Sequence, residues 1–136
     1  MSITLRKKRE KLLQLLDRLA EMSAKGIPII VEGKRDVNAL HALDVKGDII
    51  SAKTSGRRFL DVLSEVGRRG KREAILLMDF DRRGKEWTKR LAKHLEEMRI
   101  KPNLFFWKRL QGLVGRDVKD VEGLATYMKT LRKKLG

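Results

Sequence analysis

The sequence predicts an α/β fold, a three-layer sandwich in which helices cover both faces of a four-stranded, mainly parallel sheet. Short apolar runs rich in β-branched residues alternate along the chain with amphipathic segments of helical periodicity. Strands separated by helices cannot pair as hairpins, so right-handed crossovers between parallel strands are the simplest arrangement. The 136 residues suit one domain, with an N-terminal helix at 1–25, a core at 27–107 and a C-terminal loop and helix at 108–136.

The first half of the chain is predicted to form three helices and two strands. Leucines spaced by three, four and seven residues make 2–25 an amphipathic helix, and Gly26 ends it because glycine tolerates the positive φ of a helix C-cap. The apolar run at 27–31 predicts a buried strand. The next predicted elements are a short helix at 36–43, a strand at 48–51 and a helix with its apolar stripe at 59–66.

The second half is predicted to add two strands and two helices. The most apolar run of the chain, at 74–78, predicts a third strand, and the spacing of Trp87, Leu91 and Leu95 predicts a helix at 85–98. Pro102 separates that helix from a fourth predicted strand at 104–107. A polar loop at 108–120 then leads to a last helix at 121–134.

The composition narrows the function classes. Lys and Arg number 33 against 18 Asp and Glu, a formal net charge of +15, and this excess attracts phosphates, so nucleic acid is the expected partner. The absence of cysteine excludes a disulfide framework, a thiolate zinc site and a cysteine nucleophile. No apolar run approaches the ~20 residues of a membrane helix and no secretory signal is recognisable, so we expect a cytoplasmic protein without a membrane partner.

Carboxylates follow two of the predicted strands. Glu32 comes directly after the first strand, and Asp79 and Asp81 come after the third, two residues apart and therefore on the same side of an extended tip. The three converge if these strands are neighbours. Oxygen ligands without His or Cys favour Mg²⁺, or Mn²⁺, and predict phosphoryl chemistry on nucleic acid. Glu32 fits equally a role as general acid or base.

Other acids have two interpretations each. Asp36 fits a helix N-terminal charge as well as it fits the acidic site. Asp117, Asp120 and Glu122 precede or open the last helix. We favour Asp120 as an N-cap, and the alternative is that one of these three acids reaches the metal site.

The motifs VEGKRDVNAL at 31–40 and LLMDFDRRG at 76–84 together resemble the Toprim domain, the nucleotidyl-transfer and hydrolysis module of topoisomerases, bacterial primases, OLD-type nucleases and the ribonucleases that mature 5S rRNA. The resemblance implies a Rossmann-like parallel sheet between helices. It also implies that Glu32, Asp79 and Asp81 are metal-binding and catalytic carboxylates. The size and the flanking helices look most similar to the small stand-alone Toprim proteins of archaea.

Two departures limit what the resemblance implies. Many family members have a third acid two positions after the Asp-x-Asp, where this chain has Arg83, so one firm metal site is expected and the number of ions stays open. Arg82 and Arg83 can instead bind phosphate as planar forks. The sole tyrosine, Tyr127, is expected to pack within a helix, which argues against topoisomerase activity by this chain.

Substrate phosphates are expected to meet residues near the strand ends. These are Gly33, where no side chain blocks an approaching phosphate, and the cations Lys34, Lys53 and Arg57, with hydroxyl or backbone donors from Thr54, Ser55 and Gly56. The basic clusters at 6–10, 67–72 and 131–135 are expected to contact the nucleic-acid backbone without sequence preference. The aromatic residues Trp87, Phe105, Phe106 and Trp107 fit core positions better than base-stacking platforms.

The sequence therefore predicts a Mg²⁺-dependent nucleic-acid enzyme, foremost a ribonuclease-like Toprim protein that acts on structured RNA rather than DNA. One alternative is a non-catalytic RNA-binding factor in rRNA maturation or ribosome assembly that uses the metal as a bridge to phosphate. The other is a subunit of a DNA repair complex. Ribosomal or RNA-processing partners fit the first two readings, and the oligomeric state is left open.

Overall fold

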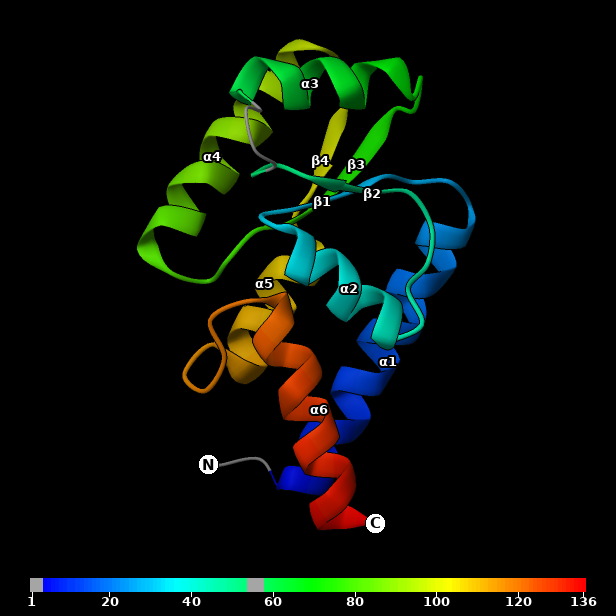
Figure 1. The fold of residues 1–136 in the computed structure, drawn as a ribbon, viewed down its shortest axis with the longest axis vertical. Coiled ribbons are helices and arrows are strands. Elements are labelled where there is room, and N and C mark those ends of the chain that lie inside the picture. The colour runs from blue at the N-terminus through cyan, green and yellow to red at the C-terminus, as the bar shows by residue number, and fades with distance from the viewer. Residues whose placement is uncertain (1–3, 54–57) are drawn as a thin grey trace.

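The sheet has four strands, all parallel, in the order β2-β1-β3-β4, and six helices surround it in the described part of the chain (Figure 1). The structure is a computed structural model and describes residues 4–53 and 58–136. Its elements are α1 Leu5–Ala24, β1 Ile29–Val31, α2 Lys34–Ala42, β2 Ile49–Ser51, α3 Phe59–Arg68, β3 Glu73–Leu77, α4 Arg82–Glu97, β4 Lys101–Asn103, α5 Phe105–Val114 and α6 Val121–Leu135. The predicted α/β fold class is confirmed.

Alternation along the two central strands builds a separate core on each face of the sheet. Ile29 of β1 and Ile75 of β3 are paired and point into the larger core, which α1, α2, α5 and α6 cover. Ile30 and Leu76, the next pair, point to the opposite face and pack against α3 and α4. Because β1 and β3 are buried on both faces, their residues are apolar rather than alternating, apart from Glu73 at the start of β3.

Two helices begin earlier than the sequence predicts. Helix α2 begins at Lys34, with Gly33 as its N-cap, and α4 begins at Arg82, with Asp81 as its N-cap. The Asp81 side chain accepts a hydrogen bond from the Gly84 N–H, one of the donors that the first helical turn leaves unpaired. The acidic residues therefore lie at or directly before the first turns of α2 and α4, and not in longer loops.

The prediction of the fourth strand is wrong. The strand is Lys101–Asn103, and the predicted strand at 104–107 forms the first turn of helix α5, which also replaces much of the loop predicted at 108–120. Phe106, Leu110 and Val114 are buried at a spacing of four, which is the helical period. Pro102 is tolerated in β4 because this strand pairs only with β3 and leaves its other edge free.

Helices α1, α2, α5 and α6 form the lower part of the molecule in Figure 1. Figure 1 shows α1 and α6 extending away from the sheet, with both chain termini at their far end. Helix α6 packs against α2, and α1 packs against α5. None of the helices in the described ranges 4–53 and 58–136 is long and apolar enough to cross a membrane.

The side chain of Leu76 in β3 is fully buried, so shortening it should destabilise the protein strongly. Leu76→Ala should lower the free energy of unfolding by about 2–5 kcal/mol, because it removes apolar contact and leaves a cavity between β3 and the helices above it. Urea denaturation followed by circular dichroism measures the change. Leu60→Ala is the matched control, since Leu60 is 69% exposed and its loss should cost less than about 0.5 kcal/mol. Equal losses in the two variants would contradict the assignment of the core.

Candidate metal centre at the sheet edge

Three carboxylates meet where β1 and β3 end. Glu32 follows β1, and Asp79 and Asp81 lie in the segment between β3 and α4. Carboxylate oxygens of the three residues lie within 4.8 Å of one another. The parallel pairing of Val31 with Leu77 brings them together, because it places the ends of the two strands side by side. The sequence prediction that these three acids converge agrees with this geometry.

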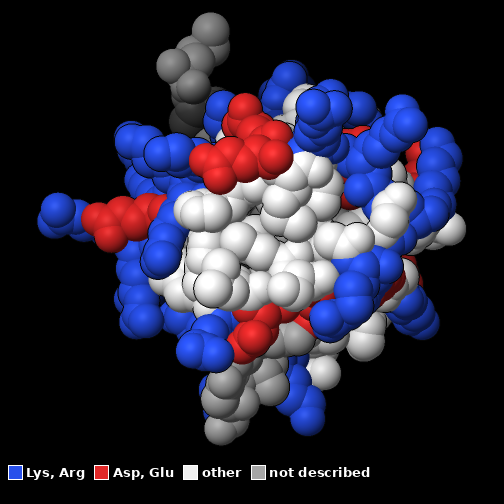
Figure 2. Space-filling model, turned by 90° about the horizontal axis from the view of Figure 1, so that it is seen from above, with Lys and Arg blue, Asp and Glu red and all other residues white. Residues whose placement is uncertain are grey.

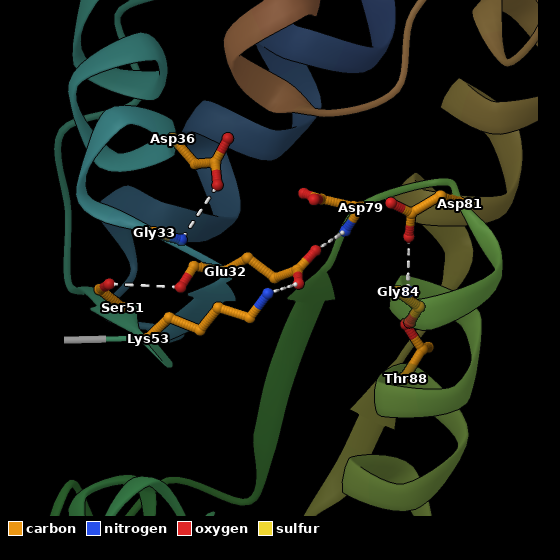
Figure 3. Close-up of polar contacts among 9 residues, drawn as sticks. All are labelled: Glu32, Gly33, Asp36, Ser51, Lys53, Asp79, Asp81, Gly84 and Thr88. Atoms are coloured by element: carbon orange, nitrogen blue, oxygen red, sulfur yellow. Dashed lines mark hydrogen bonds and ion pairs between the residues drawn. The ribbon is translucent and has the colours of Figure 1, made fainter. Parts of the chain in front are cut away.

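Glu32 is almost completely buried, with 4% of its surface exposed, and both carboxylate oxygens have partners. Its Oε2 accepts a hydrogen bond of 2.9 Å from the Asp79 N–H, and its Oε1 forms an ion pair of 2.8 Å with Lys53 Nζ (Figure 3). Burial acts to raise the pKa of Glu32, but hydrogen bonding with Asp79 and Lys53 outweighs burial and holds this pKa below its usual range. Glu32 is therefore held as a carboxylate.

Asp79 is the centre of the acidic group. Figure 3 shows the carboxyl groups of Glu32, Asp36 and Asp81 arranged around it. Burial, followed by the neighbouring Glu32 carboxylate, raises the pKa of Asp79 to about 8. Without a cation the Asp79 carboxyl therefore keeps a proton at neutral pH. A cation that binds there must displace this proton, so its affinity should increase as the pH rises toward 8.

Asp81 and Gly84 shape the outer side of the site. Asp81 is exposed, and its Oδ1 accepts a 2.7 Å hydrogen bond from the Gly84 N–H. A Cβ atom at position 84 would collide with the Asp79 carbonyl oxygen, so only glycine lets the first turn of α4 lie directly against the Asp79 backbone. The Thr88 hydroxyl donates to the Gly84 carbonyl and secures the same turn.

A second acidic group shares Asp79. Carboxylate oxygens of Asp36, Asp79 and Asp120 also lie within 4.8 Å of one another. Asp36 is buried, and it accepts hydrogen bonds from the Gly33 N–H at 3.0 Å and from the Glu122 N–H at 3.1 Å. Burial raises the pKa of Asp36 more than these two donors lower it. Asp36 thus ties α2 to the start of α6 while it faces the acidic centre.

Asp120 combines the two interpretations that its sequence position left open. Its side chain accepts a 2.6 Å hydrogen bond from the Gly123 N–H, so it is the N-cap of α6 as predicted. It also reaches the acidic centre, because the Phe80 N–H donates to the Lys119 carbonyl and ties the loop before α6 to the segment that carries Asp79. The sequence contained no signal for this grouping beyond the acidic character of the loop.

The remaining predicted residues are distributed around this centre. Lys53 faces Glu32 directly, and Gly33 donates its N–H to Asp36. Lys34 is exposed in the first turn of α2, Arg83 is exposed in the first turn of α4, and Arg82 beside it lies 3.6 Å from Glu86. Asp117 pairs with Lys8 at 3.8 Å and Glu122 with Arg35 at 3.8 Å, so their carboxylates are drawn elsewhere. Arg57, Thr54, Ser55 and Gly56 lie outside the described residues.

The donor set suits a divalent cation that prefers oxygen. Every residue of both acidic groups is an aspartate or a glutamate, the ligand type that binds Mg²⁺ and Mn²⁺. The positive charge of Lys53 and the proton on Asp79 offset part of the acidic repulsion, and a divalent ion would offset it more completely. Glu32, Asp79 and Asp81 could hold such an ion, and Asp36 and Asp120 form a second acidic group with the same Asp79.

Comparison with known proteins agrees with this arrangement. The sequence model of the Toprim domain family matches residues 26–105. A UPF0292 protein of Methanosarcina acetivorans is 36% identical over 132 residues, which cover 96% of this chain and 89% of that protein. A UPF0292 protein of Methanocaldococcus jannaschii is 38% identical over 120 residues, with 88% and 91% covered. A solved structure of a putative protein from Aquifex aeolicus superposes with a TM-score of 0.67 at 25% identity and covers 80% of this chain and 94% of that chain.

The raised pKa of Asp79 predicts that the metal-free protein loses stability as the pH rises. The unfolded carboxyl ionises near pH 4 and the folded one at about 8, so the folded state holds the proton more tightly between these values. The stability that this pKa difference confers is fully present below the pKa of Asp79 in the unfolded protein. It is lost as the pH rises through the pKa of Asp79 in the folded protein. Because Asp79 is only half-buried, solvent screening should limit the loss to about 1–2 kcal/mol between pH 5 and pH 8.5.

Urea titrations in EDTA at the two pH values measure this loss. Asp79→Asn should remove most of it and leave a smaller part from Asp36, whose pKa is also raised. Asp17→Asn, which neutralises an exposed acid of α1, is the matched control and should keep the wild-type dependence. A wild-type protein that is equally stable at both pH values would contradict the prediction.

Proposed function

Because this chain belongs to the Toprim domain family, we propose that it is a Mg²⁺-dependent enzyme that hydrolyses phosphodiester bonds in structured RNA. Family membership indicates a metal-dependent enzyme or binder of nucleic acid, and the ribonuclease activity is our proposal. The observation that carries it is the convergence of Glu32, Asp79 and Asp81, whose carboxylate oxygens lie within 4.8 Å of one another. Mn²⁺ should replace Mg²⁺, since both prefer oxygen ligands.

The residues of the site have distinct roles in this proposal. Asp79 and Asp81 would bind the ion, which when bound supplies positive charge to the phosphate oxygens as charge develops on them. Glu32 is held ionised and buried, which suits either a further metal ligand or a base that accepts a proton from the attacking water. Gly33 leaves the approach to the site open, because glycine has no Cβ atom that a phosphate would meet.

Lys53 is placed to respond to the substrate. The Lys53 side chain is 37% exposed while the Glu32 side chain that it pairs with is buried, so Lys53 lies between Glu32 and solvent. If Glu32 served as a metal ligand, its attraction for Lys53 would be weaker, and Lys53 Nζ would be available to contact a substrate phosphate. Arg82 and Arg83 are exposed at the start of α4 and follow Asp81 directly. They would bind phosphates of the RNA next to the one at the metal site.

Charge supports a nucleic acid as the substrate. The net charge of +15 favours a polyanion, and Figure 2 shows Lys and Arg side chains around the rim of the face that carries α3. We favour RNA because the motifs at 31–40 and 76–84 resemble the Toprim domain of the ribonucleases that mature 5S rRNA. RNA-processing or ribosomal partners in the cytoplasm fit this proposal.

One observation favours a second candidate, an RNA-binding factor that does not cleave. Both oxygens of Glu32 already have partners, and Arg83 replaces the third acid that many family members have. In this alternative the ion bridges the acidic centre to an RNA phosphate without turnover.

The two candidates differ in their response to metal. Labelled RNA hairpins, single-stranded DNA and duplex DNA are incubated with the protein in Mg²⁺, Mn²⁺ or EDTA. Metal-dependent RNA cleavage should fall at least about 100-fold in Asp79→Asn and in Glu32→Gln, because each removes a charge needed at the reacting phosphate. Asp17→Asn, an equal loss of charge far from the site, should cleave normally. Tight RNA binding without cleavage in any metal would favour the binding factor, and preferential DNA cleavage would contradict the choice of RNA.

Lys53→Met tests the ion pair separately. Loss of the ammonium removes a competitor for Glu32, so Mn²⁺ should bind about three- to tenfold more tightly while RNA cleavage decreases. Calorimetric titration with Mn²⁺ measures the affinity. Lys89→Met makes the same charge change on the exposed side of α4 and should leave both quantities near the wild-type values. Weaker Mn²⁺ binding in Lys53→Met would mean that Lys53 organises the site rather than competing for it.

A further inference from the structure

A basic groove runs between α1 and α5, on helices that lie largely outside the matched family region. Its volume is about 420 Å³. The lining comprises Lys11, Gln14, Leu15, Arg18, Phe105, Lys108, Arg109, Gly112 and Leu113. Four of these residues are cations and none is acidic, so the groove has one sign of charge.

The four cations have no carboxylate partner within 4.0 Å in the part of the chain that the structure describes. Elsewhere on α1, by contrast, Lys8 lies 3.8 Å from the carboxylate of Asp117. Lys11 and Arg18 lie two turns apart on α1, and Lys108 and Arg109 follow each other on α5. All four side chains are exposed, so their charge is free to neutralise an external anion.

Phe105 adds an aromatic ring to the groove, which a site that binds only phosphates would not need. It was expected to lie in the core, but it is only half-buried and lines the groove. The guanidinium carbon of Arg18 lies 4.8 Å from its ring centroid and that of Arg109 lies 5.1 Å from it. Two guanidinium groups from different helices therefore lie close to one aromatic ring, at distances typical of cation–π contacts.

The combination of lysines with an aromatic ring beside two arginines favours single-stranded RNA over duplex RNA. In single-stranded RNA the unpaired bases are free to stack on aromatic rings and on arginine planes, while lysines track the phosphates. An A-form duplex presents its phosphates but keeps its base faces stacked inside. A groove that contains both lysines and a ring flanked by arginines suits the single strand.

We propose that the α1/α5 groove binds single-stranded RNA at a place separate from the acidic centre. Lys11 and Lys108 neutralise phosphates. An unpaired base stacks against the guanidinium groups of Arg18 and Arg109. The proposal takes its class of partner from the proposed function but requires neither metal nor catalysis.

The groove and the acidic segment lie on different sides of helix α5. Trp107 Nε1 donates to the carbonyl of Met78, the residue before Asp79, so one side of the first turn of α5 faces the acidic segment. Phe105 is two residues earlier and points to about the opposite side of the helix. Helix α5 therefore lies between the groove and that segment, and at least one helix diameter, about 10 Å, separates them. A single-stranded flank of a structured RNA could occupy the groove while its folded part lies at the acids.

The test measures binding of a labelled single-stranded RNA of about 12 uridines by fluorescence anisotropy, in EDTA and on the Asp79→Asn background. Arg18→Gln/Arg109→Gln should weaken binding at least tenfold, because it removes the stacking groups together with two positive charges beside the bound strand, and should lower the logarithmic salt slope by up to about 1.4. Arg90→Gln/Arg99→Gln removes two exposed arginines in and after α4, outside the three basic clusters, and should weaken binding less than threefold. Equal losses in the two double variants would overturn the proposal.

Arg18→Lys/Arg109→Lys separates stacking from charge. These lysines keep the net charge but lack the planar group, so affinity should fall several-fold with the salt slope unchanged. Inorganic polyphosphate, which has no bases, should bind the wild-type protein and this variant equally. A duplex RNA of the same length that binds as tightly as the single strand, with the same sensitivity to Arg18 and Arg109, would also overturn the proposal. Because all assays are metal-free, a failure of cleavage leaves this result unchanged, and a failure of the groove leaves the nuclease test unchanged.

Discussion

The parallel pairing of β1 with β3 is the constraint on which the site depends. Glu32 and Asp79 are far apart in sequence, yet the register that pairs Val31 with Leu77 places them at neighbouring strand ends. Side chains alternate between the faces of a sheet, so a slip of one residue would turn Glu32 away and reverse the two cores. The hydrogen bond from the Asp79 N–H to Glu32 Oε2 joins the strand ends directly. The same contact therefore supports both fold and site.

Charge balance explains how so many acids coexist in one place. The Lys53 ammonium stabilises Glu32 as a carboxylate, and Asp79, beside that carboxylate, keeps its proton to about pH 8. The acidic centre is thus poised for a divalent cation, which can replace both compensations at once. The whole protein carries the opposite sign, with a net charge of +15, so the acidic centre is a local concentration of negative charge in a basic protein.

The helices around the Toprim core extend the site rather than only covering it. The loop between α5 and α6 carries Asp120 to the acidic centre through the hydrogen bond from the Phe80 N–H to the Lys119 carbonyl. Asp36 in turn accepts from the Glu122 N–H and fixes the start of α6 against α2. On its other side, α5 forms a basic groove with α1. One helix therefore links the acidic centre to the surface that we propose holds a single-stranded flank.

The sequence by itself determined the fold class and the three central acids, because both follow from local pattern: apolar runs alternate with helical stripes, and Glu32, Asp79 and Asp81 directly follow strands. It could not separate strand from helix at 104–107, since a short apolar run suits either, and Pro102 is acceptable in β4 only because that strand lies at the sheet edge. Only the tertiary structure decided that Asp120 reaches Asp79, that Lys53 pairs with Glu32 and that Phe105 lines a groove. These contacts join segments distant in sequence, and they depend on how whole helices and strands pack, which no local periodicity specifies.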